Sequence, residues 1–262
     1  MGDIKKIVLI GAGNVGTHLG LALHDAGLDM LQVFSRNHES AGNLAALLEA
    51  DPVHDPAAVS GDADLYVLAV SDDAIGQVAQ QIRPEGKFLV HTSGSVPMDI
   101  FRPFTAHYGV IYPLQTFSRH RKIDFRQIPV CLEANSISNM ERLNRLVSEI
   151  SEDVRSVPSD QRRLLHLAAV FACNFPNYMY RVAEGIVNSA KLDFDILRPL
   201  ILETAMKVQE AGPLESQTGP ARRGDREVME KHLALLSTNP DLQRLYKEIS
   251  GQIGHMESKG KN

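Results

Sequence analysis

Residues 5–16 read Lys-Lys-Ile-Val-Leu-Ile-Gly-Ala-Gly-Asn-Val-Gly, and this stretch decides the fold. Its first half is rich in aliphatic and β-branched residues, which favour a strand. Its second half has the pattern Gly-x-Gly-x-x-Gly, which is the fingerprint of a dinucleotide-binding β-α-β unit when it joins a strand to a helix. We expect Gly11 to make the tight turn, Gly13 to let the backbone approach a pyrophosphate, and Gly16 to let helix and strand pack closely.

The helix predicted to begin near Asn14 should direct its free N–H groups and its positive dipole end toward that pyrophosphate. We therefore assign the whole turn to cofactor binding: Gly11, Ala12, Gly13, Asn14, Val15 and Gly16.

The end of the second predicted strand, 31–34, indicates which dinucleotide is bound. Enzymes for NAD usually have an acid here, about 20 residues after the glycines, that bonds the ribose 2′-hydroxyl. This chain has Ser35, Arg36 and Asn37 instead. Arg36 can stack on the adenine and, with its two neighbours, hold a 2′-phosphate; the alternative is an exposed arginine in a loop. The sequence favours NADP over NAD as the cofactor.

Polar clusters follow two later predicted strands, 63–70 and 87–90. In an open parallel sheet, ligands lie beyond the carboxyl ends of the strands. We assign to the cofactor Val70, Ser71, Asp72, Ile75 and Thr92. We assign His91 and Ser93 to catalysis, and we assign Ser95 to the substrate together with Gln115, which follows the next strand. A hydrolase is not expected, because the chain has no Gly-x-Ser-x-Gly elbow and no acid placed to complete a triad.

The second half of the chain has a helical pattern. One long helix is predicted from Ser159 toward Ala190. Its two apolar stripes require partners on several sides, so we expect a central core helix that is also part of a dimer interface. Pro176 predicts a kink in it. Asn174, beside the kink, bonds either the freed backbone or a ligand, and it is a candidate catalytic residue. His166 is a candidate substrate residue, although such a histidine more often belongs to a core.

The loop 217–225 lies after a predicted helix that Gly212-Pro213 ends. Arg222 and Arg223 in this loop are candidates for contact with an anionic substrate or with the cofactor. The alternative is that both arginines are solvated. These elements predict an α/β protein with a Rossmann-type, doubly wound, mostly parallel sheet followed by an all-α C-terminal domain. We expect an NADP-binding domain at 1–157 and a helical substrate and dimerisation domain at 158–262.

Composition excludes several classes of function. The net charge of the 262 residues is −5 and no basic block is present, so nucleic acid is not an expected partner. No stretch is long and apolar enough to span a membrane, and the first residues lack a secretory pattern. Cys131 and Cys173 lie in apolar segments without C-x-x-C spacing, which predicts buried thiols in a reduced, cytoplasmic protein. The ten histidines show no metal-ligand spacing.

Together with the glycine fingerprint, five segments resemble one family: 35–37, 69–75, 91–95, 112–117 and 218–225. That family is the Rossmann-like proteins with a DUF2520 C-terminal domain, described as NADP oxidoreductases. More distantly, the chain is similar to pyrroline-5-carboxylate reductases, F420-dependent NADP reductases and β-hydroxyacid dehydrogenases. The resemblance implies a Rossmann domain, an all-helical second domain and a homodimer built on the C-terminal helices.

One departure from these relatives concerns the proton donor. β-Hydroxyacid dehydrogenases use a lysine one turn before an asparagine that Asn174 could match, but position 170 is Val. The proton would then come from His91, His166, a Ser or Tyr hydroxyl, or water. An imine substrate would need a proton donor less, because a protonated iminium requires no strong acid at the moment of hydride transfer. We expect an NADP(H)-dependent oxidoreductase that transfers a hydride between NADPH and a small carbonyl or imine substrate in the interdomain cleft. The alternative is a non-catalytic NADPH-binding sensor or regulatory protein.

Overall fold

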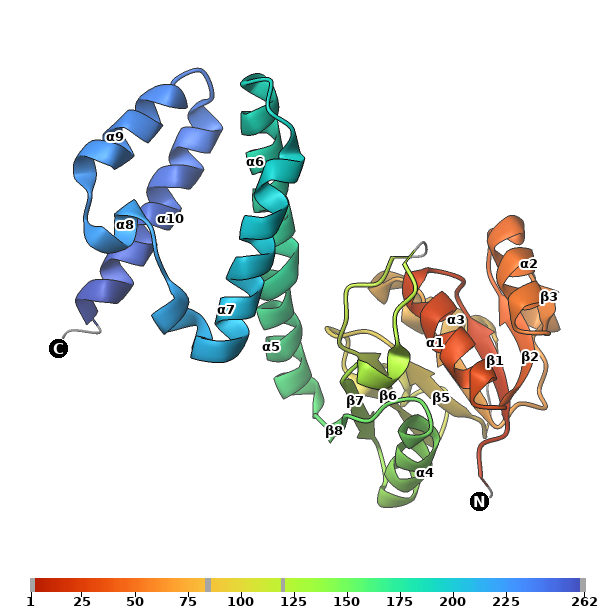
Figure 1. The fold of residues 1–262 in the computed structure, drawn as a ribbon. Coiled ribbons are helices and arrows are strands. Elements are labelled where there is room, and N and C mark those ends of the chain that lie inside the picture. Colours follow the sequence, from red (N-terminus) through yellow and green to blue (C-terminus); the bar gives the residue numbers. More distant parts are fainter. Residues whose placement is uncertain (1–2, 83–85, 119–120, 260–262) are drawn as a thin grey trace. The chain divides into compact units, whose positions relative to one another are not determined.

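The computed structural model of the chain describes residues 3–82, 86–118 and 121–259 (Figure 1). Its contacts divide the chain into two compact units, Met1–Met179 and Tyr180–Asn262. Each unit is described by itself.

The first unit is built on a sheet of eight strands within the described residues. The strands are β1 (Lys6–Ile10), β2 (Asp29–Phe34), β3 (Asp51–Val53), β4 (Leu65–Leu68), β5 (Phe88–His91), β6 (His107–Pro113), β7 (Val130–Ala134) and β8 (Val154–Ser156). Their order is β3-β2-β1-β4-β5-β6-β7-β8, and every neighbouring pair is parallel except β6 and β7. The first six strands have the order of the doubly wound dinucleotide-binding sheet. The predicted fold class is confirmed.

Helices cover both faces of this sheet, which is why its strands are apolar on both sides. Ile7 and Leu9 of β1 pack with α1 (Asn14–Asp25), α2 (His38–Leu47) and α4 (Ile137–Ser148). Val8 and Ile10 point to the other face, toward α3 (Ile75–Gln81) and the 3-10 helix η3 (Met98–Phe101). Three further 3-10 turns are η1 (Pro56–Ala58), η2 (Asp72–Ala74) and η4 (Phe125–Gln127).

The alternation of strands and α-helices is less regular than the sequence predicted. Only η3 lies between β5 and β6, and β7 follows β6 without any α-helix. An antiparallel neighbour does not require a crossover helix, because the chain simply turns back along the same edge.

The long helix predicted from Ser159 is interrupted. It consists of α5 (Ser159–Ala169), a π-helical segment η5 (Val170–Asn174) and α6 (Phe175–Ser189). Pro176 stands just after the π segment and has no N–H to donate to the preceding turn. A local widening of the helix at such a place is a common way to accommodate the lost hydrogen bond.

The remaining elements are η6 (Phe194–Leu197), α7 (Arg198–Ser216), α8 (Pro220–Arg223), α9 (Arg226–Leu235) and α10 (Pro240–Lys259). Gly212 has φ 78° and ψ 167°, so the predicted break at Gly212-Pro213 is confirmed inside α7. The segment 217–225 was predicted as a loop, but its centre forms the single helical turn α8.

The apolar stripes of the long helix are not buried as those of a core helix would be. Leu164 is 69% exposed, Phe171 62% and Ile186 48%. Arg162 is the buried residue of α5, and the described part of α6 has none. The expectation of two buried thiols is also wrong in part, since Cys131 is buried but Cys173 is exposed. No helix among the described residues is both long and apolar enough to cross a membrane.

Candidate functional site

The glycine turn after β1 is tightly packed at its two ends and open in the middle. Gly11 has φ 109°, and a Cβ there would overlap the carbonyl of Ala69. A Cβ at Gly16 would likewise overlap the carbonyl of Gly11. At Gly13, by contrast, a Cβ would meet no atom within 4 Å. The backbone at Gly13 is therefore the part of the turn that a ligand can approach closely.

A cavity of about 670 Å³ lies at the carboxyl ends of β2, β1 and β4. The chain leaves β1 toward β2 and later returns to the other side of β1 with β4, and ligands bind at such switch points in open α/β sheets. Predicted cofactor residues that line the cavity are Gly11, Ala12, Gly13, Ser35, Arg36, Asn37, Val70 and Ser71. Among the described residues that line it, none is an Asp or Glu.

Polar residues after β2 have hydrogen-bond donors that an anion could use. The hydroxyl oxygen of Ser35 accepts a hydrogen bond from the Asn37 N–H at 3.2 Å, which leaves the hydroxyl proton of Ser35 to donate. Asn37 Oδ1 caps α2 by accepting from the Ser40 N–H at 2.8 Å. Arg36 is exposed, and its guanidinium forms no hydrogen bond or ion pair with the described residues.

Two histidines that sequence reasoning missed lie beside this cavity. His54, directly after β3, is one of the lining residues, and its Nδ1 is 3.1 Å from the carbonyl oxygen of Ser35. The ring of His38 stacks on that of His54, with 3.6 Å between centroids and 18° between planes. The signal was present in the sequence, because a residue that follows a strand beside β2 reaches the same edge as Ser35.

The polar clusters after β4 and β5 are joined by hydrogen bonds. Ser93 Oγ accepts from the N–H groups of Ser95 and Val96, at 3.1 and 3.0 Å. Ser95 Oγ donates to Asp72 Oδ2. The structure thus brings together Asp72, Ser93 and Ser95, which the sequence had assigned separately.

His91 is a buried neutral imidazole. It is 0% exposed, and its Nδ1 accepts a hydrogen bond from the Ser93 N–H at 3.2 Å. Burial, followed by the positive charge of Arg162, lowers the pKa of His91 to about 4. Thr92 is buried as well, and Ile75 is 0% exposed within the core cluster of α3. These three candidate residues lie beneath the surface of the sheet edge.

A buried ion pair fixes the loop that follows β5. Arg162 of α5 is 0% exposed and pairs through Nη1 with Glu133 of β7. It also donates from Nε to the Ser93 carbonyl at 3.2 Å and from Nη2 to the Val96 carbonyl at 2.5 Å. Ser159 Oγ donates to the same Glu133 carboxylate at 2.6 Å. The start of α5, strand β7 and the loop 93–96 are held together by this network, which the sequence did not reveal.

Tyr112 and His166 form a hydrogen-bonded pair next to the same loop. Tyr112 Oη is 3.0 Å from His166 Nδ1. The ring of His166 packs on Gly94 so closely that a Cβ there would be 2.7 Å from the ring carbon Cγ. Burial raises the pKa of Tyr112 to about 12, so the phenol keeps its proton at neutral pH. His166 is exposed, and it was the one member of this pair that the sequence assigned to the site.

Other predicted site residues have local contacts. Asn14 Nδ2 donates to the Phe117 carbonyl at 3.0 Å, and the exposed Gln115 accepts from the Thr116 N–H at 2.8 Å. Asn174 is exposed in η5, and Val15 is partly exposed on α1. In the second unit, Arg222 Nη1 donates to the Glu215 and Gln217 carbonyls, and Arg223 lies 3.8 Å from Asp225.

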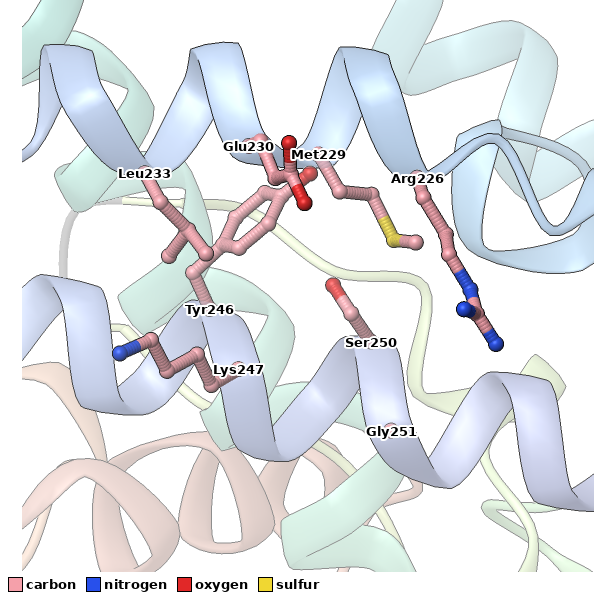
Figure 2. A pocket seen from close by; sticks show the side chains of 8 residues that line it. All are labelled: Arg226, Met229, Glu230, Leu233, Tyr246, Lys247, Ser250 and Gly251. Carbon is pink, nitrogen blue, oxygen red and sulfur yellow. The ribbon is translucent and has the colours of Figure 1, made fainter.

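Two further cavities contain none of the predicted site residues. One of about 840 Å³ lies between α1 and the segment 121–126, where basic and acidic side chains are mixed. The other, of about 280 Å³, lies between α9 and α10 (Figure 2). Figure 2 shows Met229 and Leu233 of α9 facing Tyr246 and Ser250 of α10. Within the described ranges, no three metal-ligating side chains are grouped as an ion would require.

Two family models match successive parts of the chain. Residues 3–116 match the model of the Rossmann-like domain, and residues 128–253 match DUF2520, a domain of unknown function. None of the curated proteins matches the chain. The crystal structure of the "putative NADP oxidoreductase BF3122 from Bacteroides fragilis" is 44% identical with a TM-score of 0.92, over 97% of this chain and 98% of that one.

More distant solved structures share the fold. An imine reductase from Myxococcus stipitatus in complex with NADP+ is 17% identical with a TM-score of 0.60, over 97% of this chain and 93% of that chain. A pyrroline-5-carboxylate reductase from Coxiella burnetii is 14% identical with a TM-score of 0.56, over 98% of each chain.

Proposed function

Because this chain belongs to the family that joins a Rossmann-like domain to a DUF2520 domain, we propose that it is an NADP(H)-dependent oxidoreductase acting on a small carbonyl or imine compound. One observation carries the proposal: a cavity that combines an open glycine turn with a β2 end free of acids. The relative from Bacteroides fragilis, whose description reads "putative NADP oxidoreductase", supports the same cofactor.

The residues that line the cavity support NADP as the ligand. The N–H groups around Gly13, at the start of α1, would hold a pyrophosphate without interference from a Cβ. Arg36 and the Ser35 hydroxyl supply charge and a donor for a 2′-phosphate, where a carboxylate would repel it. When bound, the nicotinamide would supply or accept a hydride.

Tyr112 and His166 are the source of the proton in this proposal. Reduction of a C=O or C=N bond places a hydride on carbon and a proton on the heteroatom. Tyr112 Oη releases that proton, and His166 Nδ1, 3.0 Å away, returns one from solvent. His91 does not serve, because its lowered pKa of about 4 keeps the ring neutral at neutral pH, without the imidazolium proton that a general acid would give up.

The test combines binding with turnover. Calorimetry with NADP+ and NAD+ should give an affinity for NADP+ at least about tenfold higher, a difference of about 1.4 kcal/mol. NADPH oxidation is then measured against 2-oxo acids, ketones, cyclic imines and F420. Tight binding without turnover of any of them would favour the alternative, a non-catalytic NADPH sensor. Equal affinity for NAD+ would contradict the choice of cofactor.

The variant Arg36→Ala tests the preference for NADP+ over NAD+ further. It should weaken NADP+ binding and leave NAD+ binding nearly unchanged, because the guanidinium is proposed to contact the 2′-phosphate. Arg126→Ala is the matched control, since Arg126 is an exposed arginine paired with Glu152 at 3.1 Å outside this cavity.

We also propose that the protein is a homodimer through its C-terminal helices. The exposed stripe that includes Leu164, Phe171 and Ile186 is apolar, and a second copy presents the same stripe for burial. Light scattering after size exclusion should give twice the chain mass of 28.8 kDa. Phe171→Glu should give a monomer, whereas the control Leu47→Glu, at a residue 58% exposed on α2, should not.

A further inference from the structure

The cavity proposed for NADP contains a titratable side chain that the nucleotide assignment has not used. His54 lines the same cavity as Ser35 and Arg36. It is partly buried, and within the described part of the lining it and Arg36 are the residues whose side chains can carry a positive charge.

The contact with Ser35 determines which ring nitrogen of His54 can meet a ligand. Nδ1 lies 3.1 Å from the Ser35 carbonyl oxygen, and a carbonyl only accepts hydrogen bonds. Nδ1 therefore carries a hydrogen, and Nε2 is the nitrogen that gains or loses a proton. A neutral Nε2 offers a lone pair, whereas a protonated Nε2 donates to an anion.

Stacking of His54 on His38 limits the positive charge that the two rings carry when no ligand is bound. Two imidazolium rings whose centroids are 3.6 Å apart would repel each other strongly. The other charged groups on the surrounding elements are Arg36 before α2, Glu39 in its first turn, and Asp55, whose Oδ1 accepts from the Ala57 N–H at 2.9 Å. Since no carboxylate is present among the described residues that line the cavity, an anionic ligand is what would stabilise a second positive charge beside Arg36.

We propose that His54 is a specificity-determining residue for the 2′-phosphate, and that it binds as the imidazolium with Nε2–H donating to a phosphate oxygen. Binding of NADP then takes up a proton, and binding of NAD does not. A phosphomonoester carries a charge of about −1.5 to −2 at neutral pH, enough to draw that proton onto the ring. The inference rests on the proposed cofactor and adds to it a pH-dependent selection between the two nucleotides.

The experiment measures binding and needs no substrate. NADP+, NAD+, adenosine 2′-phosphate and adenosine 5′-phosphate are titrated by calorimetry into the full-length chain at about pH 7 and about pH 8.5. The variants are His54→Gln and, as the matched control, His24→Gln on α1, which does not line the cavity. Buffers of different ionisation enthalpy give the number of protons taken up.

For the wild type and for His24→Gln, we expect NADP+ binding to weaken roughly fivefold to tenfold between the two pH values, and NAD+ binding to change less than about twofold. For His54→Gln, NADP+ should bind about tenfold more weakly near pH 7, and its pH dependence should disappear. A tenfold change in affinity is about what one charge-assisted hydrogen bond contributes to binding. Unchanged circular dichroism and melting temperature will establish that His54→Gln is folded.

Three results would overturn the inference. If His54→Gln bound NADP+ as the wild type does, or lost NADP+ and NAD+ binding equally, His54 would not contact the 2′-phosphate, while the choice of NADP would stand. If the wild type preferred neither NADP+ over NAD+ nor adenosine 2′-phosphate over adenosine 5′-phosphate, the proposed cofactor would be wrong, and this inference with it.

Discussion

Gly13→Ala should separate the stability of the protein from its affinity for a dinucleotide. Gly13 has φ −82° and ψ −173°, a conformation open to every L-residue, and its Cβ would meet no atom within 4 Å. Alanine also restricts the unfolded chain more than glycine does. Gly13 is also the N-cap of α1, where alanine is less favourable than glycine, and this cost offsets the gain. The free energy of unfolding without ligand should therefore change by less than about 1 kcal/mol.

Affinity should fall in the same variant. If the backbone at Gly13 touches the pyrophosphate, a methyl group there would have to push it away, and such overpacking costs about 1–3 kcal/mol. Binding of NADP+ should weaken roughly 5-fold to 150-fold. Urea unfolding with and without NADP+, together with calorimetry, measures both effects on one preparation.

Two other glycines serve as controls. Gly11→Ala should lose stability outright, because φ is 109° and the Cβ would overlap the Ala69 carbonyl. Gly42→Ala on α2, where nothing lies within 4 Å of the Cβ position, should gain stability and keep its affinity. A Gly13→Ala variant that bound NADP+ as tightly as the wild type would refute the placement of the pyrophosphate.

Three further predictions concern the interior of the first unit. Glu133→Ala leaves Arg162 buried without its carboxylate and should cost about 3–5 kcal/mol in urea unfolding, whereas Arg126→Ala at the exposed pair with Glu152 should cost at most about 1 kcal/mol. Because the pKa of His91 is lowered from 6.5 to about 4, stability should be complete above pH 6.5 and fall by up to about 3 kcal/mol as the pH falls toward 4; a His91→Asn variant that kept this slope would contradict the assignment. Tyr112→Phe should lower the turnover of a carbonyl substrate about 10²-fold or more and that of a cyclic iminium far less, in single-turnover NADPH oxidation.

Features encoded in contiguous residues could be predicted from the sequence. The glycine turn and the Ser35-Arg36-Asn37 segment lie within a few residues of the strands that place them, so strand periodicity and turn chemistry were sufficient. The edge rule for parallel sheets also indicated that the segments after β4 and β5 would lie near each other, as the bond between Ser95 and Asp72 shows.

Contacts between distant parts of the chain could not be predicted in this way. Arg162 bonds Glu133 across 29 residues, and Tyr112 meets His166 across 54. The Arg162–Glu133 and Tyr112–His166 pairs depend on the antiparallel placement of β7 and on the way α5 packs on the loop after β5. The sequence shows neither of these arrangements. Periodicity likewise identified the apolar stripes on the long helix but not whether this chain would cover them.

The contact between Gly94 and His166 has a consequence for how this sequence can evolve. The imidazole occupies the space that any side chain at position 94 would need, so the two positions share one volume. A residue larger than glycine at 94 would require a smaller one at 166, and the phenol of Tyr112 would then lose its partner. Across related chains, positions 94, 112 and 166 should therefore change together or not at all.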